Sequence, residues 1–304
     1  MSPAPSSLRP LPVPKVSGAP RAVLGLMRLS FQTAGRIAPQ VMAAWARNMY
    51  FTPRRYPPSR KERTTLARAT PFDVEFPGGQ RTRYPGGPLR AWSMGEGPVV
   101  LLCHGWESRG SRLAAAFAEP LNRAGFRAVW FDMPGHGDSP GTQSDVEAFS
   151  DAIGSVGKAV GPLHAIIAHS LGAASTTIAV TRGLETGRLA YLAPACWMVN
   201  FPERFADVFA LPPSTRAAFR ARLFQSFPEH LWTDLAGDVL SSKLTVPGLV
   251  IHDIEDGETH YEGAVAIHNA WSGSELMTTE GLGHRRIVSD PKVQARVLQF
   301  VQAS

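Results

Sequence analysis

A serine set among small residues is the first candidate for chemistry in this chain. Residues 165–174 read AIIAHSLGAA, an apolar run that leads into Ser170 and is followed at once by small side chains. This order is typical of a strand, a sharp turn and a helix, in which small neighbours let strand and helix approach closely. The free N–H groups of the helix would then point toward the serine. The pattern predicts that Ser170 is a nucleophile; the simpler interpretation is a serine in an ordinary strand-to-helix loop.

A serine nucleophile needs a base that takes its proton and an acid that orients the base. His284 is the predicted base, because it follows the last expected strand and two nearby glycines allow a tight loop. His260 and His268 are weaker candidates, since they belong to a loop and a helix after the preceding strand. His169 adjoins Ser170, but neighbouring side chains diverge, so we expect it to point away from the nucleophile.

Three acidic residues follow the strand expected over residues 248–252, namely Asp253, Glu255 and Asp256. In a parallel sheet, groups at the carboxyl ends of different strands meet at one edge, so each acid qualifies by position. We predict that Asp256 orients the histidine, because it comes one turn later than Asp253 and precedes a glycine that frees the loop. Asp253 comes directly off the strand and is the alternative.

An acyl group under attack needs hydrogen-bond donors for its developing oxyanion. The backbone N–H of Leu171 is one expected donor, because it follows the serine at the start of the helix. The second is expected from the loop His104-Gly105-Trp106, which follows the first buried strand. Gly105 permits an unusual turn, so that the N–H of Trp106 can face the serine. His104 is predicted to be structural.

The elements that would position these residues alternate along the chain from Pro98 onward. Apolar runs typical of buried strands are separated by segments with helical spacing. This alternation predicts an α/β protein with a mostly parallel central sheet and helices on both faces. The expected strands cover residues 72–76, 89–94, 99–103, 127–131, 163–168, 189–192, 248–252 and 275–278.

One segment, residues 195–243, breaks this alternation, because it has helical character and no strand-like run. We interpret it as a helical cap inserted into the sheet domain, which leaves residues 66–194 and 244–304 as the core. The cap is rich in Phe and Trp. Aromatic residues at helical spacing are more often core than ligand contacts, so none of them is assigned to a substrate.

Residues 1–65 are expected to form a separate basic extension, since they hold eleven Lys or Arg and one acidic residue. Residues 1–20 are rich in proline and predicted to be disordered. Residues 21–51 are predicted to be helical with a break near Pro39, and residues 52–70 to form a linker. The helical part is basic and amphipathic. Contact with an anionic membrane surface is one interpretation; packing on the main domain or on a second subunit is the one we favour.

Composition and motifs exclude several classes of protein. The two cysteines, Cys103 and Cys196, argue against a disulfide scaffold. Beyond residue 65 acidic residues outnumber basic ones, which argues against a nucleic-acid cleft. Phosphate-binding glycine motifs and metal-binding histidine pairs are not found, so neither a cofactor nor a metal is expected. With no apolar run of membrane-spanning length and no signal-peptide pattern, we expect a cytoplasmic protein, with membrane association through residues 21–51 as the alternative.

Four stretches together resemble the α/β-hydrolase superfamily, in its serine-hydrolase branch with a helical cap. They are residues 102–106 (LCHGW), 131–139 (FDMPGHGDS), 168–172 (AHSLG) and 283–284 (GH). Residues 251–256 (IHDIED) also resemble the acid loop of the superfamily, and the chain order of serine, acid and histidine is the one it uses. The resemblance covers the chain from about residue 70 to the end, and it implies an α/β-hydrolase fold without metal or organic cofactor.

The resemblance implies hydrolysis of an ester, thioester or amide. We expect a carboxylesterase-like enzyme acting on a small-molecule ester, with an apolar acyl group favoured by the aromatic cap. A thioesterase, peptidase or C–C hydrolase using the same residues is the first alternative, and a non-catalytic binding member of the fold is an alternative of another class. The sequence departs from the superfamily pattern at Ala168, which replaces a glycine, and at Thr259-His260, where a Val-Pro pair often follows the acid.

Overall fold

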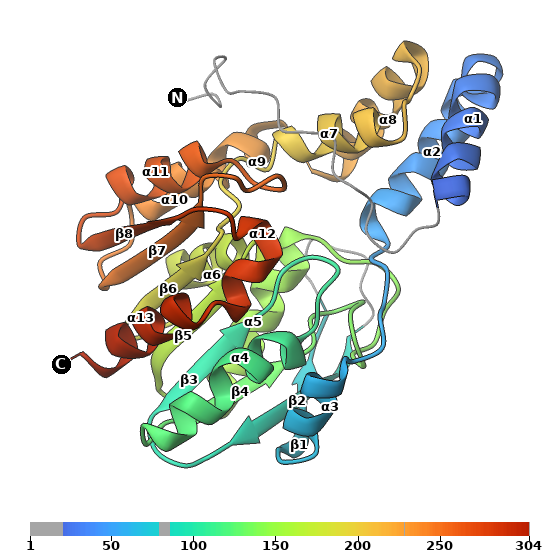
Figure 1. Ribbon diagram of the computed structural model, residues 1–304. Helices are drawn as coiled ribbons and strands as arrows, with labels where there is room; N and C mark the ends of the chain where they lie inside the picture. The colour runs from blue at the N-terminus through green and yellow to red at the C-terminus, as the bar shows by residue number, and fades with distance from the viewer. Residues whose placement is uncertain (1–20, 79–85, 228, 304) are drawn as a thin grey trace. The chain divides into compact units, whose positions relative to one another are not determined.

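The computed structural model describes residues 21–78, 86–227 and 229–303. The chain divides into two compact units, whose elements are drawn in Figure 1. Among the described residues, those up to 52 and those of 197–236 form the helical unit, and those of 53–196 and 237–303 form the sheet unit. Residues 1–20, for which disorder is predicted, lie outside the described residues.

The sheet unit is built on eight strands in the order β1-β2-β4-β3-β5-β6-β7-β8 (Figure 1). β2 pairs antiparallel with β1 and β4, and the other neighbours pair in parallel, which confirms the predicted mostly parallel sheet. Every predicted strand is present, with ends that differ by at most two residues. The strands are β1 (Thr70–Phe76), β2 (Gly87–Met94), β3 (Val99–Cys103), β4 (Arg127–Phe131), β5 (Leu163–His169), β6 (Leu189–Leu192), β7 (Gly248–Asp253) and β8 (Ser274–Thr279).

Helices occupy the connections between these strands and cover both faces of the sheet (Figure 1). A parallel pair needs a crossover to bring the chain back to the same edge, and a helix is the usual one. The helices of the sheet unit are α3 (Arg60–Leu66), α4 (Gly110–Arg123), α5 (Val146–Val160), α6 (Leu171–Thr181), α10 (Gly237–Ser241), α11 (Tyr261–Ala270), α12 (Gly283–Arg286) and α13 (Pro291–Gln302).

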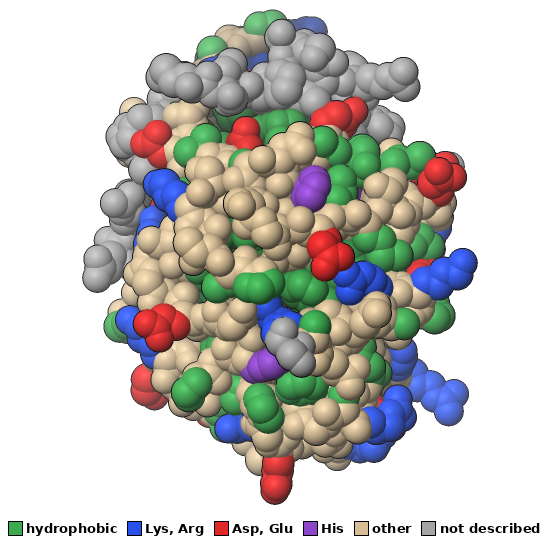
Figure 2. Space-filling view, turned by 90° about the vertical axis from the view of Figure 1, so that its left-hand side faces the viewer, with side chains coloured by type: hydrophobic (Ala, Val, Ile, Leu, Met, Phe, Trp, Pro, Cys, Tyr) green, Lys and Arg blue, Asp and Glu red, His purple; other side chains and the backbone are tan. Residues whose placement is uncertain are grey.

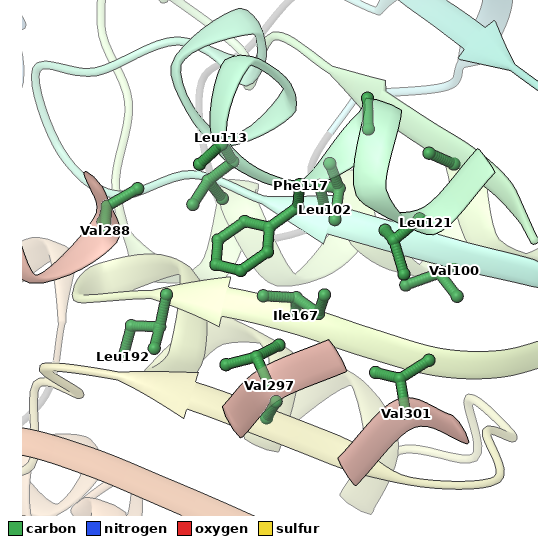
Figure 3. Packing of buried hydrophobic residues seen from close by; sticks show 14 of the residues in the cluster. Val100, Leu102, Leu113, Phe117, Leu121, Ile167, Leu192, Val288, Val297 and Val301 are labelled. Atoms are coloured by element: carbon green, nitrogen blue, oxygen red, sulfur yellow. The ribbon is translucent and has the colours of Figure 1, made fainter. Parts of the chain in front are cut away.

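One face of the sheet packs against α4 and α13, as the close view in Figure 3 shows. Side chains two residues apart on a strand point to the same face. Val100 and Leu102 of β3 and Ile167 of β5 therefore lie in one buried cluster with Phe117 of α4 and Val297 of α13. On the other face, the hydroxyl of Thr177 in α6 is hydrogen-bonded to the hydroxyl of Tyr191 in β6, at 2.8 Å. Both faces of the central strands are thus covered, which explains why β3 and β5 read as nearly continuous apolar runs.

The linker predicted for residues 52–70 is wrong in part, because helix α3 forms within it. The hydroxyl of Ser59 accepts a hydrogen bond from the N–H of Glu62 at 3.4 Å. In return, the Glu62 carboxylate accepts from the N–H of Ser59 at 3.0 Å. This capping box satisfies two donors at the helix start, and its Ser-x-x-Glu signature can be read in the sequence.

The described helices of the helical unit are α1 (Arg21–Ile37), α2 (Pro39–Phe51), α7 (Asn200–Val208), α8 (Pro213–Ser226) and α9 (Glu229–Asp234). The predicted break near Pro39 is present, since α2 begins at that proline. The Phe31 ring stacks on Trp45 at 4.7 Å, and the Tyr50 ring meets Phe219 edge-on at 5.7 Å. Residues 21–51 therefore pack on α7 and α8, whereas the sequence suggested a separate extension. The aromatic residues of α7 and α8 contribute largely to this core.

Among the described residues, no helix is both long enough and apolar enough to cross a membrane. In the same part of the chain, no three His, Cys, Asp or Glu side chains gather in a group that could hold a metal ion. Figure 2 shows one face of the sheet unit, on which acidic and basic side chains are both present. Charges of both signs on this face agree with the nearly balanced composition beyond residue 65.

Candidate active site

Ser170 lies at the turn between β5 and α6, with φ 55° and ψ −122°. A positive φ is uncommon for a residue with a side chain and persists only where the surroundings hold it. The N–H of Ser170 donates to the carbonyl of Leu192 in β6 at 3.0 Å. Gly172 lets the helix start close to β3, because a side chain there would collide with the carbonyl oxygens of Cys103 and His104. The small residue two places after the serine is therefore a steric requirement.

Three predicted residues meet at this turn. His284 Nε2 lies 2.9 Å from Ser170 Oγ, and His284 Nδ1 lies 2.8 Å from the Asp256 carboxylate. The serine follows β5, the acid follows β7, and the histidine lies in the short helix α12 after β8, where a loop was expected. Each of the three residues is buried, with at most 8% of its surface exposed. The structure thus brings them together in one hydrogen-bonded relay, and their catalytic roles remain predictions.

Asp256 receives five hydrogen bonds. Its Oδ1 accepts from the backbone N–H groups of Glu258 at 2.7 Å and Thr259 at 3.0 Å. Its Oδ2 accepts from the Thr259 hydroxyl at 3.0 Å, from His284 at 2.8 Å and from His252 at 3.2 Å. Burial opposes ionisation of Asp256, but the hydrogen bonds from His252 and His284 outweigh it and hold its pKa below the usual range. The side chain is therefore a carboxylate at neutral pH, as an orienting acid must be.

Asp253, the alternative acid, supports the loop that leads to the histidine. Its carboxylate accepts from the Thr279 hydroxyl at 2.8 Å and from the N–H of Leu282 at 2.9 Å. It also accepts from the N–H of Glu255 at 3.0 Å, within its own loop. Because these contacts join the end of β7 to the segment directly before His284, Asp253 fixes the position of that segment.

His252 contacts the relay although the sequence pattern did not single it out. It is fully buried at the end of β7, four residues before Asp256. Its Nε2 is directed at the Asp256 carboxylate, and among the described residues no partner is found for its Nδ1. Donation from Nε2 suits this arrangement, because a proton on Nδ1 would be a buried donor without an acceptor. No spacing in the sequence identifies this contact in advance, because His252 ends a strand and Asp256 lies in the loop that follows it.

His169 also contacts the relay, through the backbone of the predicted base. Its Nε2 donates to the carbonyl oxygen of His284 at 2.9 Å, so it helps to hold α12 in place. Burial, and then the neighbouring His284, lower the pKa of His169 well below its ordinary value, so the ring is neutral at neutral pH. The two weaker candidates for the base have partners of their own: His260 lies 3.9 Å from the Glu262 carboxylate, and His268 hydrogen-bonds Ser274 at 2.8 Å.

The loop after β3 lies directly against the serine. A side chain at Gly105 would come within 2.8 Å of Ser170 Cβ, so glycine is required at this close approach. The predicted oxyanion donors are the N–H of Leu171 at the start of α6 and the N–H of Trp106 in this loop. Within the described part of the chain, no acceptor is found for either N–H. Their role toward an oxyanion remains a prediction.

Two histidines fix the shape of this loop. His104 donates from Nδ1 to the Gly105 carbonyl at 2.7 Å and accepts at Nε2 from the N–H of Met133 at 2.9 Å. His136 accepts at Nε2 from the N–H of Glu107 at 3.2 Å. Burial lowers the pKa of His104 to about 4 and lowers the pKa of His136 in the same direction. Both acceptor nitrogens are therefore unprotonated at neutral pH, and these contacts agree with the structural role predicted for His104.

The sequence of the chain also matches a known protein family. The family described as serine aminopeptidase, S33, which is part of the α/β-hydrolase clan, matches residues 97–245. The match includes the loop after β3 and the turn at Ser170, on a sheet of the corresponding architecture. The chain belongs to the α/β-hydrolase superfamily. This relation confirms the superfamily and the fold class that the sequence motifs predicted.

Solved α/β-hydrolase structures resemble this one over most of their length. An esterase from Exiguobacterium antarcticum is 16% identical, with a TM-score of 0.57 over 76% of this chain and 100% of that chain. An esterase from Pyrococcus furiosus is 18% identical, with a TM-score of 0.61 over 83% and 96%. A membrane phospholipase A, described as a bacterial virulence factor, is 20% identical, with a TM-score of 0.60 over 93% and 99%. At these identities the similarity shows the fold alone. No curated protein matches the chain closely enough to indicate a relationship.

Proposed function

We propose that the protein is a carboxylesterase-like serine hydrolase, which cleaves the ester of an apolar acyl group through an acyl-enzyme. The chain of hydrogen bonds from Ser170 Oγ through His284 to Asp256 carries this proposal. At 2.9 Å the imidazole Nε2 is within reach of the serine proton, and the ionised carboxylate at Nδ1 favours the tautomer that can accept it. Membership of the α/β-hydrolase superfamily supports the same chemistry.

In the proposed reaction, Ser170 Oγ attacks the carbonyl carbon while His284 Nε2 takes the hydroxyl proton. The N–H groups of Leu171 and Trp106 bind the oxyanion of the tetrahedral intermediate. When the bond between the acyl carbon and the alkoxy oxygen breaks, His284 gives its proton to the leaving alcohol. Water then attacks the acyl-serine with the same imidazole as base, which releases the carboxylic acid and restores the serine.

A peptidase is the second candidate, because the matching family is described as a serine aminopeptidase. An amine is a poorer leaving group than an alcohol, so amide cleavage would depend more strongly on protonation by His284. Rates on p-nitrophenyl esters and on aminoacyl p-nitroanilides distinguish the two candidates. Faster turnover of the anilides would replace the ester assignment and leave the serine mechanism in place.

Labelling with a fluorophosphonate probe tests the nucleophile. We expect Ser170→Ala to abolish labelling and to lower kcat on p-nitrophenyl esters by roughly a million-fold, as loss of a serine nucleophile does in other serine hydrolases. The matched control is Ser155→Ala, which removes a hydroxyl that donates to the Asp151 carbonyl within α5. The control should label like the wild type. Unchanged labelling of Ser170→Ala would rule out Ser170 as the nucleophile. A wild-type chain that neither labels nor hydrolyses any acyl ester would instead favour a non-catalytic member of the fold.

The acyl preference has its own test. For p-nitrophenyl esters of increasing chain length, we expect kcat/KM to rise beyond the acetate, because each buried CH₂ group contributes about 0.8 kcal/mol of binding free energy at most. A profile that is flat or falls from the acetate would contradict the apolar acyl group. That outcome would leave the serine hydrolase assignment intact, since the labelling experiment decides it separately.

A further inference from the structure

Exposed apolar side chains are concentrated on the first two helices of the helical unit. Among the described residues, eight large hydrophobic side chains are exposed, and five of them lie in α1 and α2. Such side chains gain nothing from folding, and a cluster of them typically marks an interaction surface. The five are Val23, Leu26, Leu29, Ile37 and Val41, with exposed fractions from 42% to 86%.

The two sides of α1 have different environments. Leu26 and Leu29 are three residues apart, so they lie on the same side of the helix, and both are exposed. Phe31 and Gly35 are four residues apart on the other side, and both are buried. The carbonyl of Gly35 accepts a hydrogen bond from the Thr215 hydroxyl at 2.8 Å, which attaches this side to α8. One side of α1 therefore builds the helical unit, and the other presents apolar groups to solvent.

The charged side chains of α1 and α2 are all positive. Residues 21–51 contain four arginines and no acidic residue. Arg28 and Arg47 make hydrogen bonds to groups of the same unit, whereas Arg36 is exposed next to the exposed apolar side. Apolar groups flanked by cations suit a surface with anionic headgroups above acyl chains. A second copy of the chain suits this side less well, because it would bring like charges together.

We propose that the exposed side of α1, with the start of α2, docks on an anionic phospholipid surface. In this arrangement Leu26, Leu29 and Ile37 enter the boundary between headgroups and acyl chains, and Arg36 lies beside the lipid phosphates. The helix lies in the plane of the interface, because its other side stays packed on α8. This inference concerns location on a bilayer and does not depend on the proposed reaction.

Co-sedimentation of the full chain with lipid vesicles tests the proposal. We expect binding to vesicles of equal parts phosphatidylcholine and phosphatidylglycerol, weaker binding as salt is added, and at least about ten-fold weaker binding to phosphatidylcholine alone. The double variant Leu26→Ser, Leu29→Ser should bind the mixed vesicles about ten-fold more weakly, because two apolar side chains no longer leave water. Arg36→Gln should bind about five-fold more weakly, since one cation near the surface is lost.

The matched control is Val239→Ser, which removes another exposed apolar side chain, 37% exposed, on α10 of the sheet unit. It should bind the mixed vesicles like the wild type. No binding to these vesicles, or equal binding by the double variant and the wild type, would overturn the proposal. Light scattering could also show that the wild type is a dimer and the double variant a monomer. That result would overturn the proposal and assign this side of α1 to contact with a second copy of the chain. Melting curves check that the double variant folds; if it does not, Arg36→Gln and the salt dependence decide the outcome.

Discussion

The carboxylate of Asp256 joins two histidines, and one of them, His284, is hydrogen-bonded to Ser170. The other, His252, donates to the same carboxylate oxygen from the end of β7 at 3.2 Å. Each added donor stabilises the ionised form of the carboxylate and fixes its orientation. In the proposed mechanism His252 is therefore a positioning residue, which acts on the acid and does not contact the substrate.

We expect His252→Phe to lower kcat about five- to ten-fold with little change in KM, because Asp256 loses one hydrogen bond worth about 1 kcal/mol. The acid limb of the kcat/KM profile should also move to higher pH, since a carboxylate with one donor fewer attracts the imidazolium more strongly. His252→Gln is the matched variant and should retain most activity, because its amide can donate toward the same oxygen. Steady-state kinetics across pH measure both effects. An unchanged pH profile in His252→Phe would leave His252 with a packing role alone.

At the scale of single residues, the sequence predicted the side chains whose positions follow from strand order. Ser170, Asp256 and His284 each come shortly after a predicted strand, and the carboxyl ends of parallel strands meet at one edge. The supporting contacts of His252 and His169 could not be predicted in this way. They depend on which ring nitrogen faces which group once the loops have folded, and no sequence period encodes that.

At the scale of elements, the turn after β5 and the loop after β3 constrain each other. Gly172 allows α6 to begin next to the end of β3, and Gly105 allows the loop after β3 to pass beside Ser170. The loop is held in turn by His104 and His136, which bond to its backbone. The position of the serine is thus set by contacts between two connections, in addition to its own backbone angles.

Gly105→Ala should lower kcat at least about ten-fold, because the new methyl group would lie 2.8 Å from Ser170 Cβ and must displace the serine or the loop. Gly154→Ala is the matched control, since a methyl group there meets nothing within 4 Å on α5. In the control, activity should be unchanged and stability slightly higher, by up to about 1 kcal/mol, as alanine favours a helix. Kinetics and thermal melting of both variants test this. Full activity of Gly105→Ala would show that the loop can move without cost.

Stability should depend on pH through the histidines that hold the loop after β3. The pKa of His104 is lowered to about 4 in the folded chain, whereas the pKa of a histidine in an unfolded chain is about 6.5. The unfolded state therefore binds the proton first, and the stabilisation is present in full above about pH 6.5 and lost as the pH falls toward about 4. We expect roughly 3 kcal/mol from His104 across this window. Urea unfolding between pH 7 and 4 measures it, and His104→Asn should show a shallower decline.

Strands with a continuous apolar sequence were predicted correctly, whereas the two short helices α3 and α12 were not. The strands could be predicted, because a strand buried on both faces must be apolar throughout, as β3 is. Helix α3 was missed, although its capping box is visible at Ser59 and Glu62, because proline and arginine dominate the surrounding residues. Helix α12 was expected as a loop, since four residues are too few to show a helical period.

At the scale of the whole molecule, the helical unit combines segments that are far apart in the sequence. Residues 21–51 show one apolar side in the sequence, but that pattern does not say what covers it. In the structure, Phe31 and Ala43 lie in one buried cluster with Phe219 and Leu223 of α8. The pairing could not be predicted, because it depends on the shape of two surfaces that form only after each helix does. The interpretation that we favoured was packing on the main domain or on a second subunit. In the structure, one side of these helices packs on α7 and α8, which lie in the segment predicted as a cap.

The division into two units predicts two separable unfolding transitions. Phe31 is fully buried in the helical unit, and Phe117 is 1% exposed in the sheet unit. Each Phe→Ala substitution should cost about 3–5 kcal/mol, because it removes a buried ring and leaves a cavity. In calorimetry, Phe31→Ala should lower one transition temperature and Phe117→Ala the other, so that each variant is the control for its counterpart. A single transition that both substitutions lower equally would show that the two units fold as one cooperative body, since a cavity in either would then destabilise the whole.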